Sequence, residues 1–332
     1  MFRFTSITLV VLLLGLAAAV PAQGASIVFI KKGDVWMSRL DGSRQVALTR
    51  NGTPGKPYFS PTASDNGTIV ALKSVFLHSF RPSGRRIVKP RQWAINPMPT
   101  VSTEPFAVDL SSNGKIVATE NALYSTYYDP RRSETRPTIA ARFIDFFNFR
   151  TEKEIGLSDS YWDYQSPAWI DSKRVLTTSY GIFNAQVLTL RVGQRTRGVD
   201  FFRDPQRDPD TGTNAWVIVD AELTRSRDKW AAVRRPVRGD DFDLSLASIQ
   251  IYRTGNPSAA STPICAIGPG RRIPHDADPS WSPDGKTLFW WEQGRGIFST
   301  RVTSAPGCGL KPRRIVRGGN TPDLSRAKAP RR

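Results

Sequence analysis

Few residues in this chain of 332 could carry acid–base or nucleophilic chemistry. Its two histidines, His78 and His275, lie far apart, and neither accompanies the Gly-x-Ser-x-Gly motif that exposes a nucleophilic serine. His78 falls in the strand-like stretch SVFLHSF, which favours a structural role. His275 and Asp276 lie in RIPHDADPSW, directly before the best sequence motif of the chain. We therefore treat His275 and Asp276 as candidate ligand-binding residues, and we assign no catalytic residue.

The stretch RDPQRDPDTGTN, which begins at Arg203, is rich in the oxygen ligands that Ca²⁺ prefers. Its spacing matches no defined calcium loop, and Arg203 and Arg207 would repel a cation. The chain also has no Cys-x-x-Cys pair and no cluster of cysteine with histidine. We therefore expect no metal site and no cofactor.

Aromatic side chains gather in SDSYWDYQSPAW, which contains Tyr161, Trp162 and Tyr164. Rigid amphipathic rings of this kind are typical of protein-binding hot spots and can also stack on sugars or bases. The alternative is that they pack between structural units. We treat these three residues as candidate partner-binding residues. No zinc finger or RNA-recognition motif is present, so sequence-specific nucleic-acid binding is not expected.

The N-terminal residues MFRFTSITLVVLLLGLAAAVPAQGAS have one early positive charge, an apolar run and small residues suited to cleavage. This pattern predicts a secretory signal peptide over residues 1–25. The apolar run is shorter than the roughly 20 residues that span a bilayer, so we expect no membrane anchor after cleavage. The mature protein is therefore predicted to be periplasmic, associated with the cell wall, or secreted.

The only two cysteines, Cys265 and Cys308, lie in the predicted mature chain. An even number of cysteines in an exported protein predicts one disulfide, and two buried thiols are the alternative. A loop of this size closed by a disulfide stabilises the fold by roughly 2–4 kcal/mol.

The chain carries 47 Lys and Arg against 29 Asp and Glu, a formal net charge of +18. Such an excess attracts nucleic acid, phosphorylated wall polymers or lipid headgroups, although it can also be a solvated background without a partner. We expect the last residues, 326–332, to form a basic, disordered tail.

The stretch PSWSPDGKTLFWW, from Pro279 to Trp291, is one unit of a repeat. Weaker copies begin near Lys56, Glu104, Ser166 and Asp220, at intervals of roughly 45 to 60 residues, which is typical of propeller blades or solenoid units. Each copy has a proline or small residue, a turn and a run rich in β-forming residues. The structural motif comprises Pro279, Trp281, Pro283, Asp284 and Gly285. Ser282 to Gly285 are predicted to form a tight turn that precedes a buried strand.

Four strands in each of six repeats predict an all-β fold, a six-bladed β-propeller over residues 26–325. The first repeat begins directly at its second strand, and the fragment TPDLS from Thr321 supplies the missing innermost strand. The C-terminal segment is therefore expected to complete the first blade and to close the ring, which leaves no sheet edge open at that junction.

The motifs PSWSPDGKTLFWW and GDVWMSRLDGSRQ resemble the WD-like propeller repeat of TolB-like proteins, which are exported bacterial proteins. The resemblance covers most of the predicted mature chain and implies a TolB-like propeller. It does not extend to the smaller α/β domain that precedes the propeller in TolB itself, and a shared fold does not fix a function.

The sequence favours a monomeric, non-catalytic binding module or scaffold for an envelope protein or peptide, because rigid rings present loops well. A polyanion-binding component of the cell wall or envelope is one alternative. A propeller lyase or hydrolase with its site in the central channel is the other.

Overall fold

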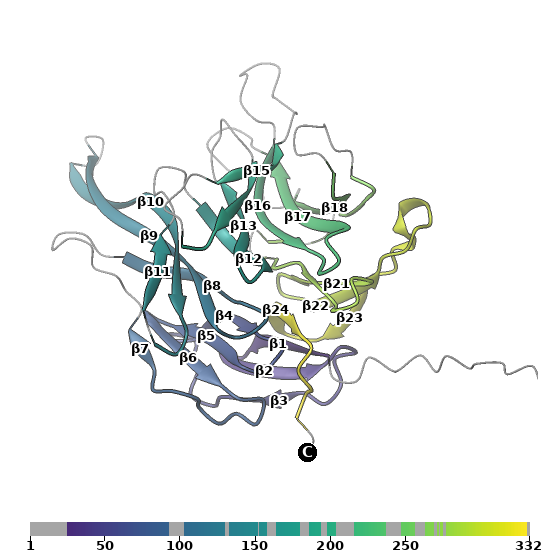
Figure 1. The fold of residues 1–332 in the computed structure, drawn as a ribbon, viewed down its shortest axis with the longest axis horizontal. Helices are drawn as coiled ribbons and strands as arrows, with labels where there is room; N and C mark the ends of the chain where they lie inside the picture. The colour runs from purple at the N-terminus through teal and green to yellow at the C-terminus, as the bar shows by residue number, and fades with distance from the viewer. Residues whose placement is uncertain are drawn as a thin grey trace, which may run out of the picture.

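The computed structural model describes residues 25–330, apart from 93–102, 130–132, 152, 158–163, 180–185, 194–197, 204–215, 237–246, 256–262, 269–270, 272 and 275–276. Its described elements are almost all β-strands. They form six antiparallel sheets of four strands each, arranged as a ring (Figure 1). The predicted all-β, six-bladed propeller is therefore confirmed.

Blades 1 to 6 are numbered in chain order, and each is described from the channel outward. The innermost strands are β24 (Gly319–Ser325), β4 (Tyr58–Ala63), β8 (Thr103–Leu110), β12 (Tyr164–Asp171), β16 (Trp216–Leu223) and β20 (Ser280–Trp281). The second strands are β1 (Ser26–Lys31), β5 (Ile69–Lys73), β9 (Ile116–Asp129), β13 (Arg174–Ser179), β17 (Lys229–Pro236) and β21 (Thr287–Glu292).

The outer half of each blade completes the sheet. The third strands are β2 (Asp34–Arg39), β6 (Phe76–Phe80), β10 (Glu134–Asn148), β14 (Gln186–Arg191), β18 (Ser248–Arg253) and β22 (Gly296–Arg301). The fourth strands are β3 (Val46–Ala47), β7 (Arg91–Gln92), β11 (Glu154–Leu157), β15 (Val199–Arg203), β19 (Cys265–Ile267) and β23 (Arg313–Val316).

The C-terminal strand closes the ring, as the sequence predicted. β24 pairs antiparallel with β1, so that Leu324 lies opposite Ile27 and Ser325 lies opposite Ser26. The two ends of the chain thus share the first blade, and neither sheet edge is left open at the junction.

The apolar core is divided among the interfaces between neighbouring blades. The described buried hydrophobic residues form six clusters, and each cluster joins two adjacent blades. The core between blades 5 and 6 contains Trp281 and Trp290 together with the two cysteines, which form the predicted disulfide Cys265–Cys308. Period-two alternation supplies both faces of each sheet with apolar residues, because every blade packs on two neighbours.

The repeat motif forms the predicted turn. Ser282 Oγ donates to Asp284 Oδ1 at 2.6 Å, and Gly285 N donates to Ser282 O at 2.7 Å. Gly285 has a φ of 65°, which a glycine adopts without steric cost. The turn then leads into β21, whose Trp290 is fully buried.

One face of the ring is defined by the strand connections. Because neighbouring strands are antiparallel, the connections from first to second strand and from third to fourth strand emerge on the same side. We call this side the turn face. The connections from second to third strand and those between blades lie on the opposite face. No helix among the described residues is long and apolar enough to cross a membrane.

Candidate binding site in the central channel

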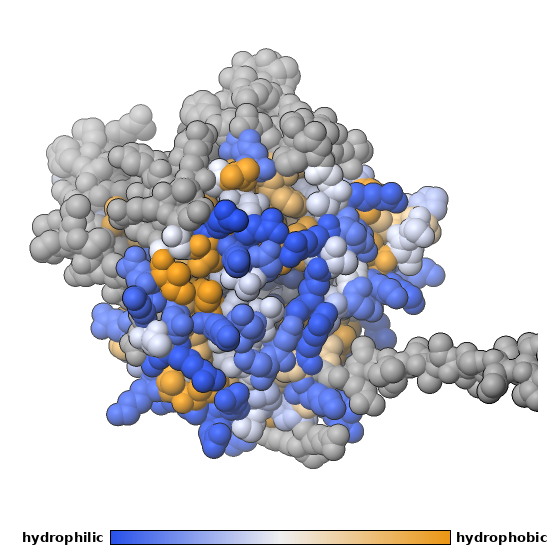
Figure 2. Space-filling model, in the orientation of Figure 1, coloured by the Kyte–Doolittle hydropathy of each residue, from blue (hydrophilic) through white to orange (hydrophobic). Residues whose placement is uncertain are grey.

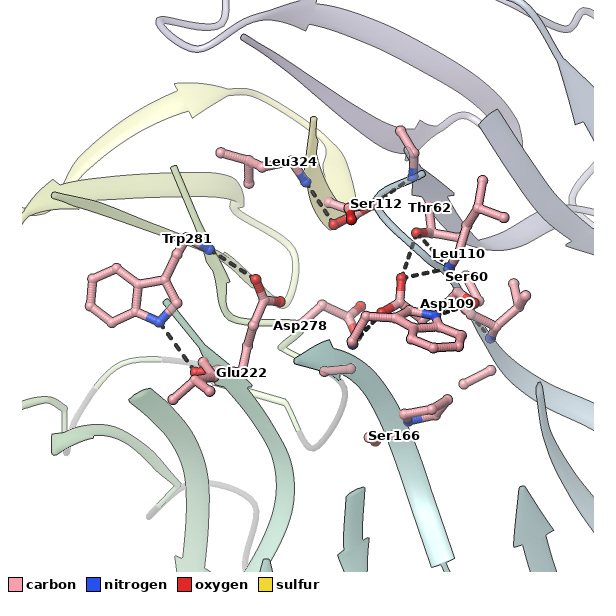
Figure 3. A pocket seen from close by; sticks show the side chains of 18 of the residues that line it. Ser60, Thr62, Asp109, Leu110, Ser112, Ser166, Glu222, Asp278, Trp281 and Leu324 are labelled. Atoms are coloured by element: carbon pink, nitrogen blue, oxygen red, sulfur yellow. Dashed lines mark hydrogen bonds between the residues drawn. The ribbon is translucent and has the colours of Figure 1, made fainter. Parts of the chain in front are cut away.

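The innermost strands enclose a cavity of about 480 Å³ at the centre of the ring (Figure 3). Five of the six innermost pairings carry a register shift, beside Thr62, Ala107, Ala168, Asp220 and Asn320. Residues at these bulges include Ser60, Ser166 and Thr321, each of which has a positive φ near 45° and directly precedes a proline. Bulges bend a strand and redirect its side chains, which here brings them to the channel wall.

Three carboxylates occupy equivalent positions on alternate blades. These channel carboxylates are Asp109 on β8, Glu222 on β16 and Asp323 on β24, and all three line the cavity. Each directly precedes a leucine: Leu110, Leu223 and Leu324. The matching positions on the three intervening blades are Thr62, Ala168 and Ser280. The ring of innermost strands therefore alternates an acid with a small residue.

Each channel carboxylate accepts a hydrogen bond from the backbone of the next blade. Asp109 Oδ2 accepts from Trp169 N at 3.0 Å, and Glu222 Oε1 accepts from Trp281 N at 3.2 Å. Asp323 Oδ2 accepts from Ala63 N at 2.7 Å. The carboxylates thus bridge blade 3 to 4, blade 5 to 6 and blade 1 to 2.

Trp169 and Trp281 each also donate a side-chain hydrogen bond to the backbone of the residue whose carboxylate accepts from their backbone N–H. Trp169 Nε1 donates to Asp109 O at 3.1 Å, and Trp281 Nε1 donates to Glu222 O at 3.2 Å. Figure 3 shows Glu222 beside Trp281. Asp109 and Glu222 make the same pair of bonds to the next blade, so each carboxylate has a structural role in addition to any contact with a ligand.

Hydroxyl groups of the intervening blades complete the acidic wall. Thr62 Oγ1 donates to Asp109 Oδ1 at 2.7 Å. Ser280 Oγ lies 3.3 Å from Glu222 Oε1 and 3.5 Å from Asp323 Oδ1. Thr321 Oγ1, on the same wall, is buried and has no hydrogen-bond partner.

Burial and mutual repulsion raise the pKa values of the channel carboxylates. Burial and the nearby charge of Asp323 raise the pKa of Asp109 to about 7. Burial, Asp323 and Asp109 raise the pKa of Glu222 well above its usual value, and burial raises the pKa of Asp323. Near neutral pH the three groups are therefore not all ionised. The wall offers acceptor oxygens and exchangeable protons.

An ion pair spans the turn-face end of the channel. Arg225, from the β16–β17 turn of blade 5, forms two charge-assisted hydrogen bonds with Asp65, from the β4–β5 turn of blade 2. Blades 2 and 5 lie on opposite sides of the ring. Arg225 also lines the cavity and lowers the pKa of Asp323. The pair therefore narrows the channel at this end.

Among the described residues that line the channel there is no histidine, and the serines described there bond mainly to the backbone. Ser60 Oγ accepts from Val108 N at 2.8 Å, and Ser166 Oγ donates to Val219 O at 3.0 Å, so both serines bond to backbone atoms. No group of three or more His, Cys, Asp or Glu side chains in the described part of the chain is placed to hold a metal ion.

Of the five sequence-predicted partner residues, the structure describes only Tyr164. Tyr161, Trp162, His275 and Asp276 lie outside the described residues. Tyr164 is fully buried in the core between blades 3 and 4, and its hydroxyl accepts a bond from Gly198 N at 2.9 Å.

His78 lies in the core, as its strand-like surroundings indicated. It is buried beside Tyr58, with Nδ1 3.4 Å from the tyrosine oxygen. Burial and the charges of Arg86 and Lys73 lower the pKa of His78 to about 4, so the ring is neutral at physiological pH.

The channel carboxylates were not among the residues predicted from sequence. The signal that could have identified them is the Asp-Leu or Glu-Leu dipeptide at one position of three repeats, in AVDL, DAEL and TPDL. It becomes visible only when the innermost strands are aligned on their bulges.

No protein-family model and no curated protein matches the sequence. Solved structures do match the fold. An oligogalacturonate lyase in complex with manganese aligns with a TM-score of 0.51 and 10% identity, over 86% of this chain and 70% of that one. An oligogalacturonate lyase from Vibrio parahaemolyticus aligns with a TM-score of 0.49 and 9% identity, over 86% of this chain and 71% of that one.

A prolyl endopeptidase structure also aligns, with a TM-score of 0.46 and 13% identity. It matches 78% of this chain and only 34% of the endopeptidase. At identities this low the likeness concerns the fold alone. The match at a TM-score of 0.51 therefore supports the propeller fold and nothing further.

Proposed function

We propose that this protein is an exported, non-catalytic binding module of TolB-like type, and that its central channel receives a segment of an envelope protein or peptide. The observation that carries this proposal is the polar cavity of about 480 Å³ enclosed by the innermost strands. A cavity of this size lies within the range of ordinary ligand sites.

The chemistry of the wall indicates what kind of group enters. Asp109, Glu222 and Asp323 present acceptor oxygens, and at least part of their charge is retained near neutral pH. A group that donates hydrogen bonds or carries positive charge, such as a lysine, an arginine or a chain amino terminus, would pair with them. An acidic group would be repelled. We therefore infer a partner segment that inserts a basic or amide-rich end.

The test uses a side chain that fills the channel without removing a carboxylate. Ala168 lines the cavity between Asp109 and Glu222, so Ala168→Phe reduces the space available to a ligand. Ala266→Phe, at an exposed position of the outer strand β19, is the matched control. Envelope extract of the host is passed over each immobilised variant at high salt, and the retained proteins are identified.

The expected result is one protein that the wild type and the Ala266→Phe variant retain and that the Ala168→Phe variant loses. A lysine-rich or arginine-rich peptide should compete with it more strongly than an acidic peptide of equal length. Equal retention by both variants would contradict the channel as the binding site. Thermal melting of each variant shows whether the fold is intact.

A lyase or hydrolase with its site in the channel is the second candidate. The observation in its favour is the pKa of Asp109 near 7, because such a carboxyl exchanges a proton readily at physiological pH. Its bonds to Trp169 N and Leu110 N weigh against it, since they give the carboxylate a structural task. Turnover of an acidic sugar oligomer that Asp109→Asn abolishes, while binding and folding persist, would establish this candidate.

A further inference from the structure

Exposed basic side chains surround the turn face of the ring. They come from the first-to-second and third-to-fourth connections of all six blades, and Arg326 follows β24 on the same side. The exposed members, which include the last residues of four strands, are Arg39, Arg44, Arg85, Arg86, Lys89, Lys115, Arg150, Lys153, Lys173, Arg191, Arg225, Arg227, Arg253, Lys286, Arg301, Lys311 and Arg326.

The acidic residues of these same turns already have local partners. Asp65 pairs with Arg225, and Asp171 pairs with Arg174 and Arg227. Asp284 accepts from Ser282 Oγ and Lys286 N, and Asp41 accepts from Ser43 N at 2.9 Å. These acids shape their turns, and they are too few to neutralise the surrounding cations. The turn face therefore carries a net positive charge.

The charge is most concentrated in blade 2. No acidic residue occurs between Asp65 and Glu104, and the β6–β7 connection reads RPSGRR from Arg81. Bonds from Arg81 N to Arg85 O and from Gly84 N to Arg81 O close this connection into a tight turn. Among the described residues, no ion pair involves Arg81, Arg85 or Arg86.

The C-terminal segment adds charge beside this turn. A Cβ atom built at Gly67 would lie 3.3 Å from Pro82 Cγ and 3.6 Å from Ala327 Cβ, so the Arg81–Arg86 turn and the C-terminal segment both border Gly67. Ser26 Oγ holds this segment through a 2.8 Å bond to Ala327 O. Arg326 and Lys328 flank Ala327 and increase the local positive charge.

The turn face is the one toward the viewer in Figure 1, where the segment after β24 runs in front of blade 1. Figure 2 shows hydrophilic side chains across much of this face, with only small apolar areas between them. The described residues contain few exposed large hydrophobic side chains on any surface, namely Phe76, Phe106 and Val199. Insertion of an apolar wedge into a partner is therefore not the mode of binding that this face favours.

We propose that the turn face docks the protein electrostatically on a membrane surface rich in anionic phospholipid headgroups. The cations come from turns of all six blades around the ring, so they form a broad surface rather than a single track. A planar array of phosphates can contact all blades at once, whereas a linear polyanion would follow a line or a groove of cations. This orientation leaves the opposite face of the ring free.

Vesicle flotation tests the proposal with the purified mature protein. The vesicles contain phosphatidylcholine alone or phosphatidylcholine with phosphatidylglycerol, at salt concentrations of about 0.1 M and about 1 M, because the higher concentration screens exposed charges beyond roughly 3 Å. We expect binding only to the anionic vesicles and loss of binding at high salt.

The double variant Arg85→Glu and Arg86→Glu should lower the vesicle partition coefficient at least about 30-fold, since each basic side chain near an anionic surface contributes roughly fivefold. The matched control is Lys32→Glu with Lys56→Glu, which makes the same charge change with exposed residues of the opposite face. The control should keep most of the affinity.

Two outcomes would overturn the proposal. An equal loss in both double variants would show that net charge, and not the turn face, attracts the vesicles. Binding to nucleic acid or to an anionic polysaccharide, without binding to anionic vesicles, would assign the face to a polymer. The high-salt capture with Ala168→Phe is independent of this result, because it tests the channel under conditions in which electrostatic docking is screened.

Discussion

The channel wall and the turn face have opposite charge and use that charge in opposite ways. In the channel, Asp109, Glu222 and Asp323 are partly buried, accept backbone hydrogen bonds from the next blade and have raised pKa values. On the turn face, arginine and lysine side chains extend into solvent, and few have an acidic partner. The positive net charge therefore comes from residues on the surface of the molecule, whereas the wall of the central channel is acidic.

This difference shows why a sum of charges is a poor guide to a binding site. A buried carboxylate loses its hydration, and its electrostatic interactions are strong only with groups close to it in a medium of low polarity. Its exact position therefore decides which groups it can bind. Exposed cations contribute to one summed electrostatic potential that extends about one Debye length from the surface. One such cation can therefore replace another with little change in that potential. Mutations in the two regions should accordingly differ in kind. Channel variants should affect folding and selectivity, whereas turn-face variants should affect association.

The largest effect is expected from removal of the strand that carries Asp323. A chain that ends before Asn320 lacks most of β24, which leaves β1 unpaired on its inner side and removes one bridge to blade 2. We expect loss of cooperative unfolding, because the ring then has an open blade. A chain that ends before Lys328 keeps β24 and the hydrogen bond from Ser26 Oγ to Ala327 O, so its melting temperature should change by less than about 2 °C. An unchanged melting temperature in the shorter chain would refute ring closure by β24.

The sequence was sufficient for the fold because the fold depends on features that repeat. Pro279, Asp284 and Gly285 identify a turn, and a period of about 50 residues identifies a blade. The missing innermost strand of the first repeat and the surplus TPDLS at the end predicted the ring closure.

The site was less accessible to sequence reasoning for physical reasons. The channel carboxylates lie 101 to 214 residues apart in sequence, and they meet only because alternate blades place them on one wall. The β-bulges that set the orientation of these side chains also cannot be located from the sequence. Aromatic clusters were easier to notice, yet Tyr164 proved to be buried in a blade interface.

The second prediction compares one carboxylate with one cation. Asp109→Ala removes the acceptor of Trp169 N and of Thr62 Oγ1, and it should reduce the free energy of unfolding by about 2 kcal/mol, the cost of an unpaired buried polar group. Arg85→Ala on the turn face should change it by less than about 0.5 kcal/mol. Urea denaturation measures both values. A neutral Asp109→Ala variant would mean that relief of repulsion in the channel offsets the lost bonds.

The third prediction concerns pH. Folding raises the pKa of Asp109 to about 7 and of Asp145 to about 8, in both cases chiefly through burial. The folded state therefore binds more protons than the unfolded chain, and stability falls as the pH rises toward these values. His78 acts in the opposite direction, because its pKa is lowered to about 4, but its contribution ends near pH 6.5. We expect the free energy of unfolding to decrease between pH 6.5 and about 8.5.

Asp145→Asn isolates one part of this pH dependence. Asn121 Nδ2 donates to Asp145 Oδ2 at 2.9 Å, whereas Asn121 Oδ1 and Asp145 Oδ1 are buried without a partner. An amide at residue 145 keeps the shape of the side chain and cannot ionise. The variant should gain stability relative to the wild type as the pH rises from 6.5 to about 8.5. Parallel pH curves for the two proteins would show that Asp145 does not titrate in this range.

The smallest effect is expected at Arg225, where the two regions meet. Its guanidinium group bonds to Asp65 across the turn-face end of the channel, and both side chains are partly exposed to solvent. An exposed ion pair contributes at most about 1 kcal/mol, so Arg225→Ala and Asp65→Ala should show a coupling energy of about 1 kcal/mol or less in a double-mutant cycle. A coupling energy well above that value would mean that the Arg225–Asp65 pair stabilises the fold as strongly as the carboxylate bridges in the channel. Arg225 also lowers the pKa of Asp323, so its removal should raise that pKa further. The cation of the turn face would then be shown to adjust the proton content of the acidic channel while adding little to stability.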